Sequence, residues 1–210
     1  MSVLRSTLLS DGSSDRVLIP ILDWLLQSKI TRLILSETKW ADFGYRRAPP
    51  GSLEEKIVFA VEDYPCDLLF VHRDAEAQDP ANRKMEILNA VRLAGIQPPV
   101  VCVIPVRMSE AWLLLDEMAI RSASGNPRGR MPLNLPASNA VEQSADPKEV
   151  LFQALRVASA QTGRRLRALD VHQRRHTVAE RMNFHLLRSL PAFVRLETEL
   201  SATLDANDWN

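Results

Sequence analysis

The chain has 210 residues, of which 46% are hydrophobic and 25% are charged, with 26 basic and 26 acidic side chains. This length suits one medium-sized domain, alone or with an extension, and the hydrophobic fraction excludes an intrinsically disordered chain. No stretch approaches the roughly 18 apolar residues that a membrane span needs, and the run before Asp11 is too short for a secretory signal. Cys66 and Cys102 lie inside apolar runs, which indicates buried, reduced thiols and a cytoplasmic protein.

The balanced net charge conceals an uneven distribution along the chain. Residues 1–120 carry 13 Lys or Arg against 17 Asp or Glu, whereas residues 121–210 carry 13 against 9. Between Arg156 and Arg188 there are eight arginines and only two acidic residues. Such a segment would attract a polyanion, although a solvated helix surface balanced by acids elsewhere explains it equally well.

The first half of the chain alternates short apolar runs, typical of strands, with runs of helical periodicity. The run at residues 67–72 is too apolar to leave one face in water, which indicates a central parallel strand. Strands are predicted at residues 4–9, 31–36, 67–72 and 100–106. Their alternation with helices predicts an α/β fold, an open parallel sheet with helices on both faces.

Helix signals stand between these strands. The run from Val17 to Leu26 has helical spacing and follows Ser13 and Ser14, either of which can cap it. Pro20 inside this run indicates either a kink or a later helix start. Further helix starts are indicated at Ser52, Pro80 and Ser109.

The remaining segments complete the predicted organisation of the chain. Residues 40–51 contain two glycines and two prolines and are predicted to be a loop. From residue 147 onward, leucines at helical spacing predict a mostly helical C-terminal extension. The predicted regions are an α/β domain at 1–124, an irregular linker or insertion at 125–146, and the extension at 147–210.

Acidic residues follow the carboxyl ends of the predicted strands. Asp11 and Asp15 follow the first strand, Asp74 and Glu76 the third, and Glu110 the fourth. In an open parallel sheet these ends meet at one edge, where binding sites lie. Clustered carboxylates repel one another unless a cation neutralises them, and oxygen ligands suit Mg²⁺ or Mn²⁺. The sequence therefore predicts a metal site, although Asp and Ser after strands are also common as helix caps.

No Cys/His pattern with zinc spacing accompanies these acids, and none of the four histidines, His72 included, is assigned to the cluster. The order of the acidic motifs resembles the Toprim family. The run D-G-S-S-D from Asp11 resembles the acidic-Gly motif after the family's first strand, and D-A-E from Asp74 resembles its D-x-D. S-E-A-W-L-L around Glu110 and N-F-H-L-L-R-S-L-P-A-F from Asn183 are similar to an uncharacterised bacterial Toprim-related family.

That family is similar in turn to the Toprim part of the overcoming-lysogenization-defect nucleases. The resemblance implies a domain that holds Mg²⁺ or Mn²⁺ and cleaves phosphodiester bonds in nucleic acid, in phage defence or DNA repair. DNA is favoured over RNA as the substrate, and the sequence leaves this choice open. By this resemblance Asp11 takes the place of the family glutamate, a general acid or base, and Asp74 and Glu76 take the place of its two metal-binding aspartates. Glu110 completes the site as a further metal ligand or orients water.

Two departures from the family pattern leave an alternative open. Asp11 is one methylene shorter than glutamate and Glu76 is one methylene longer than aspartate, so that cation binding could survive while catalysis is lost. The alternative is a non-catalytic Toprim-like module that acts with a partner, such as an ATPase. The sequence leaves open whether the chain forms oligomers.

Basic residues are the candidates for holding the nucleic acid. Five arginines in the basic segment would suit phosphate contacts, which position a strand without reading its sequence: Arg164, Arg165, Arg167, Arg174 and Arg175. They would equally suit an acidic partner protein. Near the acidic edge stand Arg16, Arg73 and Arg107, one of which is expected to contact either a scissile phosphate or a neighbouring carboxylate.

Overall fold

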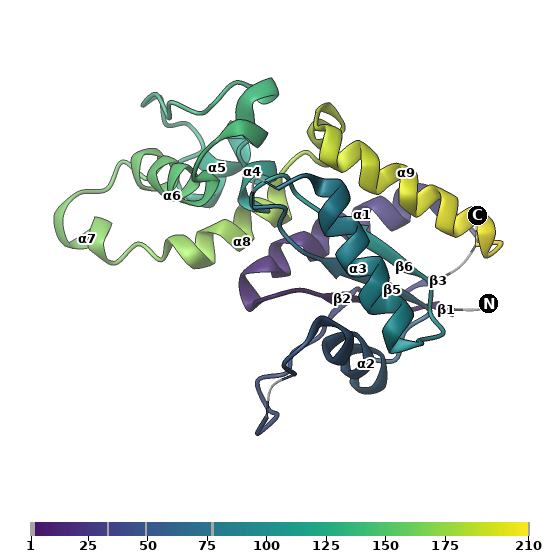
Figure 1. The fold of residues 1–210 in the computed structure, drawn as a ribbon. Coiled ribbons are helices and arrows are strands. Elements are labelled where there is room, and N and C mark those ends of the chain that lie inside the picture. Colours follow the sequence, from purple (N-terminus) through teal and green to yellow (C-terminus); the bar gives the residue numbers. More distant parts are fainter. Residues whose placement is uncertain (1–2, 33, 49, 77, 210) are drawn as a thin grey trace. The chain divides into compact units, whose positions relative to one another are not determined.

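The protein has an α/β fold, seen in a computed structural model that describes residues 3–32, 34–48, 50–76 and 78–209 (Figure 1). The chain divides into two compact units. Unit 1 comprises Met1–Ile104 together with Arg195–Asn210, and unit 2 comprises Pro105–Val194. This division differs from the predicted boundary at residue 124, because the helices within 110–123 pack with later helices of unit 2 and because the end of the chain returns to unit 1.

Unit 1 is built on parallel strands. Strand β1 pairs with β3, and a second sheet has the order β4-β2-β5-β6, with every pair parallel. In the second sheet Leu8 lies opposite both Trp40 and Phe70, and Phe70 lies opposite Val101. The strands are β1 (Val3–Leu4), β2 (Ser6–Leu9), β3 (Ile34–Leu35), β4 (Lys39–Trp40), β5 (Leu68–His72) and β6 (Val100–Val103).

The strand predicted at residues 4–9 is divided at Arg5. The backbone N–H and the guanidinium of Arg5 donate to the Asp67 carboxylate, and its carbonyl accepts from the backbone N–H of Asp67 and Leu68. The strand predicted at 31–36 is reduced to β3, and Leu33 lies outside the described residues. The predicted loop at 40–51 begins with the second residue of β4, an edge strand too short to show an alternating pattern.

The helices of unit 1 begin largely where local signals indicate. Pro20 lies in the first turn of its helix, where a missing N–H is tolerated, so the helix starts later and neither Ser13 nor Ser14 caps it. Ser52 accepts from the Glu55 backbone N–H in a capping box. The elements are η1 (Ser13–Leu18), α1 (Ile19–Lys29), α2 (Leu53–Asp63), α3 (Pro80–Ala94) and the larger part of α9 (Pro191–Ala206).

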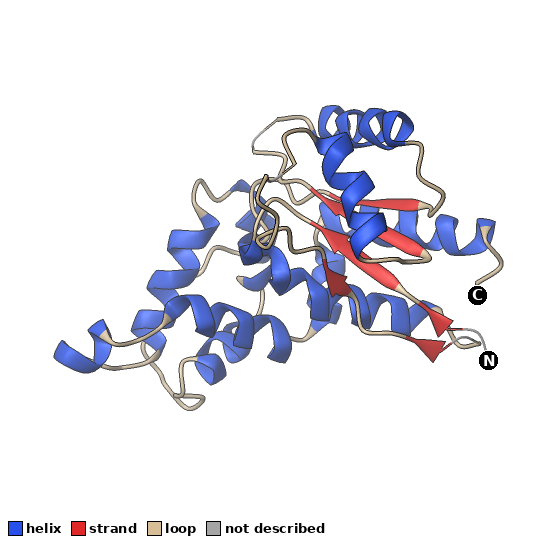
Figure 2. Ribbon diagram, turned by 90° about the horizontal axis from the view of Figure 1, so that it is seen from below, coloured by secondary structure: helices blue, strands red, loops and turns tan. Residues whose placement is uncertain are grey.

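Helices cover both faces of the sheet (Figure 2). On one face, side chains of β2, β5 and β6 pack with α2 and α3 in a buried cluster that includes Leu9, Val71, Ile57 and Ile87. Because successive side chains of a strand alternate between faces, Leu8 and its register partners face the opposite side. There, α1 is joined to α9 by the ion pair of Lys29 and Glu197 at 3.1 Å.

The strand order fixes where a site can form. The chain leaves β2 for β4 on one side of the sheet and then crosses to β5 and β6 on the other. The reversal therefore lies between β2 and β5, and ligands of open α/β sheets bind beyond the carboxyl ends of the two strands at such a reversal. Among the described residues, those there are 10–15, after β2, and 73–76, 78 and 79, after β5.

Unit 2 is helical and packs around Trp112, which is fully buried and makes an edge-to-face contact with Phe193 at 5.6 Å between ring centroids. Residues 125–146, all of them described, contain the short helix η2 and otherwise neither helix nor strand. Among the described residues, no helix combines the length and hydrophobicity needed to cross a membrane. The helices are α4 (Glu110–Leu113), α5 (Glu117–Ala123), η2 (Ser138–Gln143), α6 (Pro147–Ala158), α7 (Gly163–Arg167), α8 (Val171–Arg181) and η3 (Phe184–Ser189).

Candidate functional site

Two carboxylates from separate loops meet at one buried imidazole, that of His72. This residue is the last of β5 and its exposed fraction is 2%. Its Nδ1 lies 3.5 Å from Asp15 Oδ2 and its Nε2 lies 3.2 Å from Asp74 Oδ1. Asp15 follows β2 and Asp74 follows β5, so the reversal of strand order brings together acids far apart in the sequence.

His72 carries a positive charge at neutral pH. Burial lowers the pKa of this imidazole, but the carboxylates of Asp15 and Asp74 outweigh burial and raise the pKa to about 9. Burial also raises the pKa of Asp15, yet His72 and hydrogen bonds from Gly12 N–H and Ser14 Oγ bring the pKa below its ordinary value. His72 Nδ1 makes no hydrogen bond to any described atom, so its contact with Asp15 is an ion pair only.

Asp11 lies at the same edge, but both its oxygens face side-chain cations. Oδ1 is 3.2 Å from Lys56 Nζ and Oδ2 is 2.9 Å from Arg73 Nε. Arg73 also lies 3.0 Å from Glu86, so this arginine forms salt bridges with carboxylates, as one of the two predicted alternatives expects. Side chains of the protein thus supply part of the positive charge that clustered carboxylates require.

Glu76 ends a continuous series of ion pairs along this edge. Its backbone is in the left-handed region, with φ of 51°, and its side chain is 72% exposed. Oε2 lies 3.5 Å from the buried Arg83, which in turn lies 2.5 Å from Glu86. We name this series the ion-pair chain; it runs through Lys56, Asp11, Arg73, Glu86, Arg83 and Glu76.

The donors at this edge fit a magnesium ion only in part. Mg²⁺ is usually held by one or two carboxylates and several waters, and Asp74 and Glu76 suit that pattern. Only the Oδ1 atom of Asp74 contacts another described side chain, that of His72, and the Glu76 side chain is mostly exposed. Asp11 is less suited to hold the magnesium ion, because the positive charges of Lys56 and Arg73 beside it would repel the metal. In the part of the chain that the structure describes, no three ligand residues gather into a metal-binding group.

Glu110 belongs to unit 2, where it is buried and paired. Its Oε1 lies 2.6 Å from Arg175 Nη1, and both side chains are shielded from solvent. Arg175 is only 3% exposed, so the prediction that it contacts a phosphate backbone needs correction: its guanidinium neutralises a buried acid. The charge on Glu110 is thus balanced within unit 2.

The other four predicted arginines differ in their surroundings. Arg174 is half-buried and donates to the carbonyl of Ala123 at 3.0 Å. Arg164, Arg165 and Arg167 are exposed on α7 and make no ion pair with any described residue. Three of the five predicted arginines therefore remain free to meet a polyanion.

The residue that the sequence interpretation missed is His72. His72 has no zinc-ligand spacing to the acidic residues, and no role was predicted for it. A signal was nevertheless present, because His72 closes an otherwise apolar strand immediately before Arg73 and Asp74. A buried imidazole needs polar partners, and the adjacent aspartate is one of them.

The chain was compared with protein-family models, with curated proteins and with solved structures. None of the three comparisons gives a match. The resemblance to the Toprim family stays a prediction from the sequence.

Proposed function

We propose that unit 1 is a Toprim-like domain that cleaves phosphodiester bonds in nucleic acid with the help of Mg²⁺ or Mn²⁺. The observation that carries the proposal is the convergence of Asp15 and Asp74 on His72 at the reversal of strand order. DNA is the favoured substrate, and phage defence or DNA repair the favoured setting, both by the resemblance in sequence.

Each residue of the edge has a role in this proposal. Asp74 and Glu76 would hold the metal ion, which when bound stabilises negative charge on the phosphoryl and leaving oxygens. His72 orients Asp74 through Nε2 and limits the negative charge that has gathered there. Arg73 presents a guanidinium beside the metal ligands, the group best suited to grip a phosphate oxygen. Asp11 positions Arg73 and Lys56.

Replacement of Asp74 tests this proposal. Asp74→Asn keeps an oxygen that can accept from His72 but loses the charge that attracts a metal. We expect Mg²⁺- or Mn²⁺-dependent cleavage of single- and double-stranded DNA to fall on the order of 100-fold in this variant. Glu62→Gln removes an equal charge from an exposed position of α2 and should cleave like the unmodified protein. Metal-dependent cleavage that persists unchanged in Asp74→Asn would refute the proposal.

A second function is favoured by the surroundings of Asp11. Lys56 and Arg73 occupy both its oxygens, and its side chain is shorter than the glutamate it would replace. A non-catalytic module would bind metal and nucleic acid and leave the chemistry to a partner, such as an ATPase encoded beside it. A purified chain that binds Mn²⁺ but leaves nucleic acids intact, alone and with that ATPase, would support this second function.

A further inference from the structure

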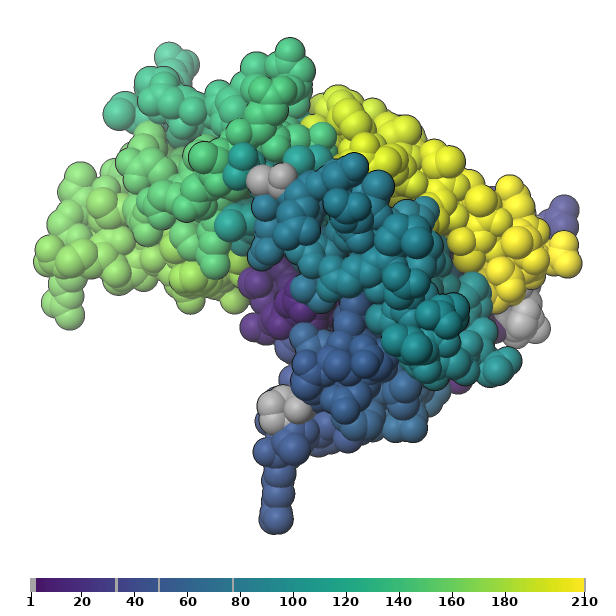
Figure 3. All heavy atoms as spheres, viewed as in Figure 1, coloured from purple at the N-terminus to yellow at the C-terminus, as the bar shows by residue number. Residues whose placement is uncertain are grey.

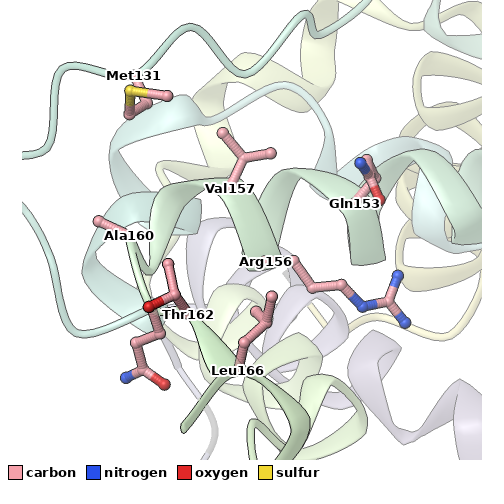
Figure 4. Close-up of a pocket in the computed structure, with 8 residues that line it drawn as sticks. Met131, Gln153, Arg156, Val157, Ala160, Thr162 and Leu166 are labelled. Carbon is pink, nitrogen blue, oxygen red and sulfur yellow. The ribbon is translucent and has the colours of Figure 1, made fainter. Parts of the chain in front are cut away.

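Unit 2 contains a cavity of about 460 Å³ that the proposed cleavage does not use. Its apolar lining residues are Met131, Val157, Ala160 and Leu166, and its polar lining residues are Gln153, Arg156, Gln161 and Thr162. The labelled residues in Figure 4 come from α6, from the connection between α6 and α7, from α7, and from the irregular segment that holds Met131. A volume of this size falls within the roughly 300–1,000 Å³ that is usual for small-molecule sites.

Three unpaired arginines lie on the same short helix, α7, as Leu166, which lines this cavity. Leu166 of α7 lines the cavity, and Arg165 and Arg167 are its immediate neighbours in the chain, with Arg164 one residue further. None of the five residues of α7, all of which are described, is buried. Figure 3 shows this segment, in light green, at the surface of unit 2. Three positive charges within four residues of α7 make this helix attractive to an anion.

We propose that this cavity and α7 together bind a nucleoside phosphate. The apolar lining residues would receive the base, the glutamine amides would hydrogen-bond its edge, and the arginines would contact the phosphates. An acidic peptide could satisfy the arginines, but it would leave the amide-lined cavity unused. The ligand is either a free nucleotide or an unpaired nucleotide of a single strand, and both offer the same chemistry.

This proposal and the cleavage proposed for unit 1 have one thing in common, a partner that is a nucleotide or a nucleic acid. It concerns binding and is measured in EDTA, where no metal-dependent cleavage occurs. Either proposal can therefore fail while the other stands.

Binding of three probes by fluorescence anisotropy and calorimetry tests the proposal. The probes are a 12-nucleotide single strand of mixed sequence, the duplex of the same sequence, and adenosine monophosphate. We expect the combined variant Arg164→Ala, Arg165→Ala and Arg167→Ala to weaken binding of the single strand roughly tenfold or more. The slope of log affinity against log salt should fall by about 2, since each phosphate contact on a single strand contributes about 0.7.

A second set of variants fills the cavity and is measured in the same binding experiments. Val157→Trp should weaken binding roughly tenfold while leaving the salt slope unchanged, since it removes room for the base and no charge. Met131→Trp, at an exposed position, repeats this test with little risk to folding. The matched control is Arg32→Ala, Arg47→Ala and Arg92→Ala, which removes three exposed arginines from unit 1 and should change affinity less than twofold.

The outcomes separate the alternatives. Affinity for adenosine monophosphate that the cavity variants abolish identifies a free nucleotide, and tighter binding of the single strand than of the duplex identifies an unpaired nucleotide. Unchanged binding in both tryptophan variants would overturn the proposal, because the arginines would then act without the cavity. Unchanged binding in the α7 variant would also overturn it and would leave these arginines to a protein partner.

Discussion

His72 is the residue on which the candidate site depends, because two acids share its charge. The unfolded chain has the ordinary histidine pKa of 6.5, and the folded protein raises the pKa to about 9. A raised pKa stabilises the fold fully below pH 6.5, and this stabilisation is lost as the pH rises through 9. We therefore expect the free energy of unfolding to decrease between pH 6.5 and 9.5 by on the order of 3 kcal/mol.

Urea denaturation of the metal-free protein at a series of pH values measures this effect. Burial raises the pKa of the Cys102 thiol from 9.0 to about 12, so this thiol also makes the free energy of unfolding depend on pH in the alkaline range. The comparison is therefore with His72→Gln, which carries no charge at any pH and should show a flatter profile. An equally steep fall in the variant would mean that His72 is not the cause.

Glu110 and Arg175 illustrate how a buried pair can resemble a catalytic acid in the sequence. Removing one partner of such a pair leaves an uncompensated charge, so Glu110→Ala should destabilise the protein by about 3–5 kcal/mol. The double variant Glu110→Leu with Arg175→Met should recover most of this loss. Thermal and urea unfolding measure both changes. A Glu110→Ala protein of unchanged stability that has lost cleavage activity would instead establish a catalytic role for Glu110.

At the scale of elements, α9 protects the edge of the sheet. Glu199 accepts from the backbone N–H of Cys102 in the edge strand β6 at 2.9 Å and also pairs with Lys84 of α3. Glu199→Ala should lower the free energy of unfolding by about 1–3 kcal/mol, because it leaves a strand amide unsatisfied. Lys84→Ala removes only the half-exposed ion pair and should cost less than about 1 kcal/mol. Equal urea midpoints for the two variants would contradict this role of α9.

The elements that the sequence predicts well are those with strong local signals. The strand β5 is apolar up to its last residue, His72, and α3 is bounded by Pro80 at its start and Gly95, with φ of 61°, at its end. The sequence could not show β4, whose two residues become a strand only through pairing with β2. Nor could it show the break at Arg5, which depends on a hydrogen-bonding partner 62 residues away.

For the molecule as a whole, the sequence predicts where the site lies better than what surrounds it. Parallel strands deliver their carboxyl ends to one edge, so the neighbourhood of Asp15 and Asp74 follows from the order of the elements. The partners Lys56 and Arg83 come from the helices α2 and α3, and their contacts depend on tertiary packing that no local pattern encodes. The observed units differ from the predicted boundary at residue 124 for the same reason, since composition shows neither that residues 110–123 pack with later helices nor that the chain end returns to unit 1.

The most direct test of metal binding between the loops after β2 and β5 is a crystal of the protein grown with Mn²⁺. Anomalous diffraction should show one Mn²⁺ in direct contact with Asp74 and Glu76, and the peak should vanish in Asp74→Asn. A crystal with Mn²⁺ elsewhere, or with none while Lys56, Arg73 and Arg83 keep their acidic partners, would show that protein cations alone neutralise this edge.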